Sequence, residues 1–168
     1  MTDAKEQGSL AGDVDALVSA LDARAALEIG IMQTLGDWLA NETERDTLVA
    51  RLRAFTPLVR GTTPVHVSRY IRASDAFHRI FFSLLRNPAL FEVYNSMDLP
   101  ELLRRVLEVA PISIREIFDD HTSLTDALQS STVHPPRAAM IAKANRTRAA
   151  LPTFLTDSPA AGKSAAVA

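Results

Sequence analysis

Two histidines stand at the centres of apolar helical faces in this sequence. His78 lies in the run Val65–Asn87, and His121 lies in the segment that follows Pro111, each with apolar residues three and four positions away. For one inward histidine, the ordinary interpretation is a core imidazole bonded to a backbone carbonyl. Two on two helices weaken that interpretation, because helical bundles build ligand and metal sites from side chains on facing helices. An imidazole there could hold a ligand, bind a metal ion or transfer a proton near neutral pH.

Other polar residues share these inward faces. Ser74 lies one turn before His78, while Arg24 and Glu28 are four residues apart on an apolar face of the first long helix and can pair. That pair is either a structural ion pair or a place where Arg24 offers a fork of donors to an anionic ligand. Lys143 flanks the apolar stripe of the last helix, where its amine could reach solvent or a ligand. The predicted ligand-binding residues are Arg24, Ser74, His78, His121 and Lys143.

The elements that must position these residues are all helices. The apolar spacing is helical throughout, and no period-two strand interrupts it. We therefore predict an all-α fold, an antiparallel bundle of six or seven helices around a central cavity. Asn41 or Thr43 is expected to cap the second helix, and Pro88 suits the first position of a short one. The expected helices cover residues 13–40, 41–60, 63–87, 88–94, 98–110, 111–128 and 134–151.

Length and composition predict one ordinary domain with two loose ends. The chain has 168 residues, of which 47% are hydrophobic and 23% charged, and the net charge is −2. We expect a disordered tail over 1–12, a helical domain over 13–155 and a disordered tail over 156–168. The balanced charge leaves no electrostatic footprint for nucleic acid. The chain has no cysteine, which excludes thiolate sites and fits a cytoplasmic protein.

Several function classes lack their sequence signals. No Gly-x-Ser-x-Gly, Gly-rich phosphate loop, His-Glu-x-x-His or EF-hand pattern is present. The N-terminal residues have no apolar signal core, and the longest apolar run is far shorter than the roughly 20 residues needed to span a bilayer. We therefore expect no membrane segment.

An ordered set of short motifs resembles a known family. The set covers about Leu17 to Leu151 and resembles the FCD domain, the ligand-binding domain of the FadR branch of GntR transcriptional regulators. The motifs are Arg24-x-x-x-Glu28, Asp75-Ala76-Phe77-His78-Arg79, Asn87-Pro88-x-Leu90, Asp120-His121-x-x-Leu124-x-x-Ala127-Leu128 and the stretch from Ala139 to Arg148. The resemblance implies an all-α bundle around a cavity that binds small organic acids. In many members the cavity holds a divalent metal, bound by an Asp, a His one turn later and two further His. An attached winged helix then changes its hold on DNA, usually in a dimer.

The chain departs from the family's metal-binding pattern at two of four positions. His78 and His121 match, whereas Ser74 stands where the family has its Asp and Lys143 where it has its last His. A metal of the Zn, Ni or Mn type at His78 and His121 stays open, with Asp75 as a further ligand if the helix is rotated. Lys143 could instead supply the positive charge and bind a carboxylate directly. Only about a dozen residues precede the first helix, so no winged helix and no direct nucleic-acid binding are expected.

Three functions are compatible with these residues. The first is a stand-alone effector-binding domain that binds a small organic acid in transcriptional or metabolic regulation, as a homodimer. The second is an enzyme that has reused the cavity for acid/base chemistry on a small carbonyl or carboxylate metabolite. In such an enzyme, His78 or His121 would be a general base, and Lys143 could form a Schiff base. The third is a regulator whose pocket no longer has a ligand.

Overall fold

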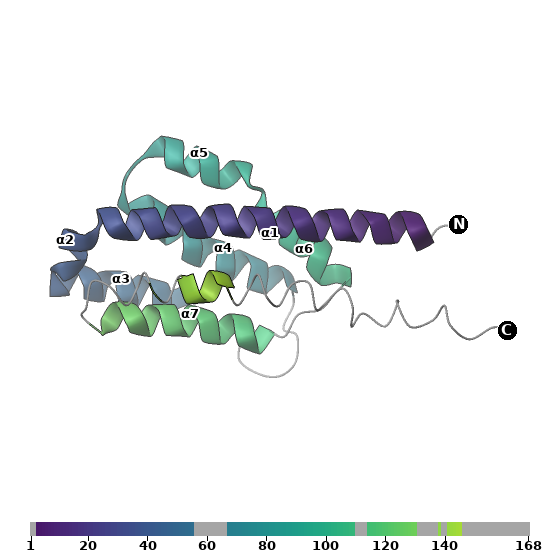
Figure 1. The fold of residues 1–168 in the computed structure, drawn as a ribbon. Helices are drawn as coiled ribbons and strands as arrows, with labels where there is room; N and C mark the ends of the chain where they lie inside the picture. The colour runs from purple at the N-terminus through teal and green to yellow at the C-terminus, as the bar shows by residue number, and fades with distance from the viewer. Residues whose placement is uncertain (1–2, 56–66, 110–113, 131–137, 139–140, 146–168) are drawn as a thin grey trace.

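A computed structural model describes residues 3–55, 67–109, 114–130, 138 and 141–145. In this part of the chain all regular structure is helical, which confirms the predicted all-α fold. None of the helices within these ranges is long and apolar enough to cross a membrane. The labelled helices are α1 (Asp3–Thr34), α2 (Gly36–Ala40), α3 (Glu42–Phe55), α4 (Val67–Leu84), α5 (Pro88–Ser96), α6 (Leu99–Val109) and α7 (Ile114–Gln129) (Figure 1).

Helix α1 runs along the whole bundle and packs against α4 and α6 (Figure 1). It begins at Asp3, so residues 3–12, which the sequence predicted to belong to a tail, are helical. Gly8 and Gly12 each disfavour a helix by about 1 kcal/mol relative to alanine. Once a helix is nucleated, however, each added residue gains a hydrogen bond at little further cost. Leu17 is completely buried, so tertiary packing holds the helix from which this extension grows.

The first predicted helix, 13–40, is two helices in the structure. Helix α1 ends at Thr34, and α2 begins at Gly36 after Leu35 leaves the ideal helical conformation with φ −91° and ψ 10°. The break lets the chain turn toward α3, which contacts α2. The apolar periodicity continues across the break, which is why the sequence pattern did not reveal it.

Two of the expected helix starts carry a side-chain cap in the structure. The Oδ1 atom of Asn41 accepts a hydrogen bond from the backbone N–H of Glu44 at 3.2 Å, which caps α3. Asn87 does the same for Ala89 at 3.0 Å, and Pro88 takes the first position of α5. Of the two predicted caps, Asn41 and Thr43, Asn41 thus takes this role, and the prediction that Pro88 starts a helix is confirmed.

Helix α4 is the centre of the bundle, where it contacts α1, α3, α5 and α6. Its inward face is buried from Tyr70 to Phe82 and carries both aromatic and polar residues. Phe81 and Phe82 are completely buried, and Ser74 and His78 share their face. The predicted start of this helix at Thr63 lies outside the described residues.

Helix α7 lies beside α3 (Figure 1). The side chain of Arg53 on α3 donates to Gln129 and to Asp126, the latter at 3.4 Å, at the C-terminal end of α7. Leu124 and Leu128 of α7 are buried. These contacts turn the face that carries His121 toward the interior.

The last predicted helix, 134–151, is described only at 138 and 141–145, where the chain is helical. Lys143 is buried there, whereas Ile141 is 39% exposed. The rest of this helix and the predicted tail over 156–168 lie outside the described residues.

The core around α4 gives a direct test of the fold. Phe81→Ala should lower the free energy of unfolding by about 3–5 kcal/mol, because it removes a fully buried ring and leaves a cavity. Val93→Ala is the control: Val93 is 46% exposed, so its loss should change stability by about 0.5 kcal/mol or less. Denaturant unfolding followed by circular dichroism measures both, and equal effects would contradict this packing.

Candidate functional site

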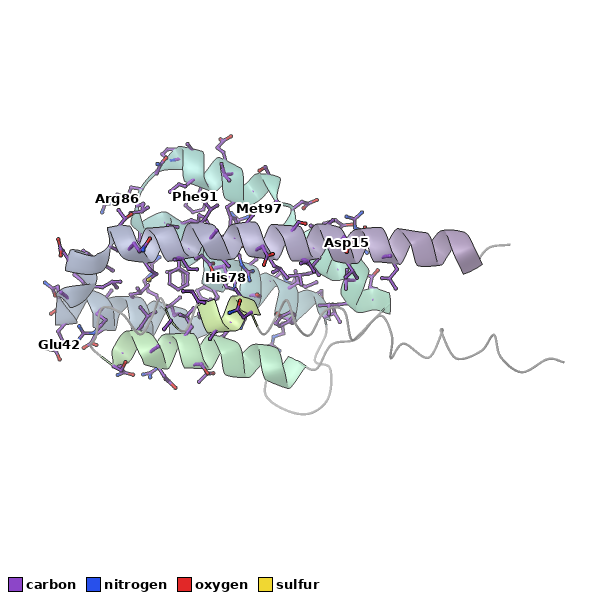
Figure 2. All side chains as sticks on the ribbon, in the orientation of Figure 1. Asp15, Glu42, His78, Arg86, Phe91 and Met97 are labelled. Atoms are coloured by element: carbon purple, nitrogen blue, oxygen red, sulfur yellow. The ribbon has the colours of Figure 1, made fainter. Side chains whose placement is uncertain are left out.

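The ring of His78 is held at both nitrogens. It has no exposed surface, its Nδ1 lies 2.6 Å from Oε1 of Glu28 on α1, and its Nε2 lies 3.1 Å from Nζ of Lys143. Figure 2 shows His78 in the middle of the bundle. An ammonium group only donates hydrogen bonds, so Nε2 accepts from Lys143 and the Nδ1–H donates to Glu28. One imidazole therefore joins α1, α4 and the segment 141–145.

Glu28 also faces Arg24, as the four-residue spacing predicted. The Nε atom of Arg24 lies 3.9 Å from Oε1 of Glu28, with both side chains at least nine-tenths buried. At that distance the two groups form an ion pair, but they are too far apart for a hydrogen bond. Within the described part of the chain, the buried Nε of Arg24 has no hydrogen-bond acceptor. The site thus holds a guanidinium donor that is still to be satisfied.

Burial and the neighbouring cations set the charges of this cluster. Burial lowers the pKa of His78 well below its ordinary value of 6.5, and the positive charges of Arg24 and Lys143 lower it further. Burial raises the pKa of Glu28, although Arg24 and Lys143 oppose that shift. The imidazole is therefore neutral at neutral pH, and its Nδ1–H bond to Glu28 stabilises the carboxylate form.

His121 on α7 lies against the same cluster. Its ring centroid is 5.2 Å from that of His78 and 4.6 Å from that of Phe77. Its Nε2 lies 3.5 Å from Oγ of Ser74, at the outer limit of a hydrogen bond. The hydroxyl of Thr125 donates to the backbone carbonyl of His121 at 2.8 Å. These contacts bring α7 to the face of α4 that carries His78.

All five residues predicted to bind a ligand thus gather in one buried cluster. Their part in ligand binding stays a prediction. The helical spacing predicted Glu28 beside Arg24, but it did not predict that Glu28 is the partner of His78. The signal was present, since a carboxylate on an apolar face needs a buried partner, but nothing in the spacing pointed to a histidine 50 residues away. The cluster members are Arg24, Glu28, Ser74, His78, His121 and Lys143.

The cluster does not fit a divalent metal ion. Asp75 is committed elsewhere: its Oδ2 accepts from Nε of Arg79 at 2.7 Å and its Oδ1 from the hydroxyl of Tyr94 on α5 at 2.9 Å. Both ring nitrogens of His78 are also engaged. Among the residues with described positions, no three His, Asp or Glu side chains are grouped to hold a metal. Stable metal sites usually need three or four such ligands.

Comparison with known protein families identifies the class of this domain. The model of the FCD domain matches residues 19–145, and the chain therefore belongs to the FCD family. The FCD domain is a ligand-binding regulatory domain of GntR-family regulators. Neither a curated protein nor a solved structure matches the chain.

The lowered pKa of His78 predicts how stability depends on pH. Below pH 6.5 the unfolded chain protonates this histidine while the folded one does not, so stability that is present above pH 6.5 is lost as the pH falls. The loss is at most about 1.4 kcal/mol per pH unit for one group. Glu28, whose pKa is raised, acts in the opposite direction.

Urea unfolding between about pH 7 and pH 5.5 measures this slope. His78→Asn removes the titrating ring but keeps an N–H for Glu28. Its stability should fall less steeply with pH than that of the unsubstituted protein. The two proteins differ only at residue 78, so the difference in slope reports His78 and its pairing with Glu28. Identical slopes would rule out a neutral buried His78.

Proposed function

We propose that this domain binds a small organic acid as a regulatory effector, with the ligand carboxylate between Arg24 and Lys143. One observation carries the proposal: the buried cluster has one positive charge in excess. Arg24 and Lys143 are cations, Glu28 is the anion and His78 is neutral. The nearby Asp75 is already paired with Arg79. This count covers the side chains with described positions.

An excess buried charge favours an anionic ligand for a physical reason. A charge removed from water is costly unless an opposite charge and hydrogen bonds compensate for it. Both Arg24 and Lys143 lower the pKa of His78, which reports a positive potential at the ring. A carboxylate that entered this potential would be stabilised by the same two cations. The cluster therefore suits an acid better than a neutral or cationic metabolite.

The donors of the cluster also suit a carboxylate. The Nε–H of Arg24 has no acceptor in the described part of the chain, and a guanidinium can donate two parallel hydrogen bonds to a carboxylate. Ser74 offers a hydroxyl on the same face of α4. His121 adds a ring nitrogen within 3.5 Å of that hydroxyl. These polar groups could orient the remainder of a small acid.

A regulatory role follows from where the cluster residues come from. They are supplied by α1, α4, α7 and the segment 141–145. A ligand held among them would tie these four segments together, so its binding free energy would add to the stability of the assembled bundle. That coupling suits a domain whose family acts in regulation. We also propose a homodimer, on the resemblance to the family, and sedimentation analysis would test it.

Loss of either cation should weaken acid binding. Arg24→Gln or Lys143→Met should lower the affinity about 10- to 100-fold, because each removes a charge-assisted hydrogen bond worth about 1.5–3 kcal/mol. Thermal-shift screening of small mono- and dicarboxylic acids would find the ligand, and calorimetry would then measure the affinity of each variant.

Arg104→Gln is the matched control for that experiment. Arg104 lies on the surface of α6 and pairs with Glu101 and Glu108. Its substitution removes the same charge from the protein but leaves the cluster unchanged, so binding should not change. Equal losses in Arg24→Gln and Arg104→Gln would mean that net charge, not the cluster, attracts the acid.

A further inference from the structure

We infer that Lys143 is the built-in cation of this site, and that the site binds a monocarboxylate without a metal ion. The ammonium of Lys143 lies where the lone pair of His78 points. It therefore supplies the positive charge that a metal ion would otherwise supply to the same imidazole. The part of this inference that concerns the ligand rests on the proposed function; the part that concerns Lys143 and metal does not.

The hydrogen bonds of His78 leave no lone pair for a metal. A neutral imidazole carries its proton on one nitrogen and a lone pair on the other. Here the proton is on Nδ1, directed at Glu28, and the lone pair on Nε2 accepts from Lys143. A carboxylate on the far nitrogen is also how proteins orient a histidine toward a metal. The Glu28–His78 pair thus has the form of a metal-binding histidine and its support, with an ammonium in the metal's position.

The other side chains that could bind a metal do not replace the lone pair of His78. His121 is a second imidazole, but the hydroxyl of Ser74 beside it is a weak ligand compared with a carboxylate. Asp75 is held by Arg79 and Tyr94. A dication would also be repelled by Lys143 at close range. Ser74 and Lys143 are thus the two positions that keep metal out.

The charge of the cluster also selects among acids. With one positive charge in excess over the described side chains, a monoanion brings the cluster to neutrality. A second carboxylate on the ligand would leave one negative charge buried and uncompensated, which is costly. A metal ion in place of Lys143 would have raised the excess charge and favoured dianions. The residue at 143 therefore helps to determine the class of ligand.

Restoring metal-type ligands at these two positions tests the inference. We expect the unsubstituted protein and Lys143→Met to bind no stoichiometric Zn²⁺. Lys143→Met removes the charge and adds only a thioether, which lies outside the usual Zn²⁺ ligand set of Cys, His, Asp and Glu, so it is the matched control. The double variant Ser74→Asp/Lys143→His should bind about one Zn²⁺ per chain, at least tenfold more tightly than Lys143→Met. Adding His78→Ala to the double variant should abolish this Zn²⁺ binding. Titration calorimetry and elemental analysis after dialysis measure this, with circular dichroism to confirm folding.

Two results would overturn the role of Lys143. One is stoichiometric Zn²⁺ in the unsubstituted protein that His78→Ala abolishes. The other is a folded double variant that binds Zn²⁺ no better than Lys143→Met. If the double variant does not fold, the titration of the unsubstituted protein decides alone.

Ligand binding in the presence of EDTA separates this inference from the proposed function. Acetate, propionate and lactate should stabilise the protein equally with and without EDTA, and more than malonate or succinate does. Binding that EDTA abolishes, or a preference for the diacids, would overturn the inference and leave an acid-binding function intact. If no acid binds any variant, the proposed function fails, and the Zn²⁺ titrations still decide what Lys143 does.

Discussion

The bonds of His78 to Glu28 and Lys143 are the interaction on which the rest of the site depends. A ring with no exposed surface must find partners at both nitrogens inside the protein, because an unsatisfied buried polar group costs about 1–3 kcal/mol. These partners come from α1 and from the segment 141–145, far from α4 in sequence. The three segments can satisfy one another only in a single arrangement. The polar cluster therefore specifies how the helices pack as well as what they could bind.

The same bonds determine the electrostatics. Because His78 donates to Glu28 and accepts from Lys143, it stays neutral and adds no charge to the cluster. Two cations then face one carboxylate, and an N–H of Arg24 has no acceptor in the described structure. The acid-binding function that we propose for this FCD domain rests on that arrangement of charges. We infer that two side chains, Ser74 and Lys143, separate the chemistry of the cluster from that of a metal site, although residues 19–145 match the family model.

Local signals predicted much of the fold. Asn41 and Pro88 each act within one helical turn, so their neighbours in sequence reveal the helix starts that they mark. The limits of α1 could not be found in this way. Its extension to Asp3 depends on propagation from a packed segment, and its end at Thr34 interrupts a continuous apolar pattern. In both places the sequence preference is weak, and packing against the other helices decides the conformation.

By itself, the sequence determined which side chains face inward and to which family the chain is similar. Helical periodicity is a local property, so the inward directions of Arg24, His78 and His121 follow from their neighbours three and four residues away. Only the tertiary structure decided which of these residues meet. The bond of His78 to Glu28 joins positions 50 apart, and its bond to Lys143 joins positions 65 apart. Such pairings arise from the packing of whole helices, and no spacing within one helix encodes them.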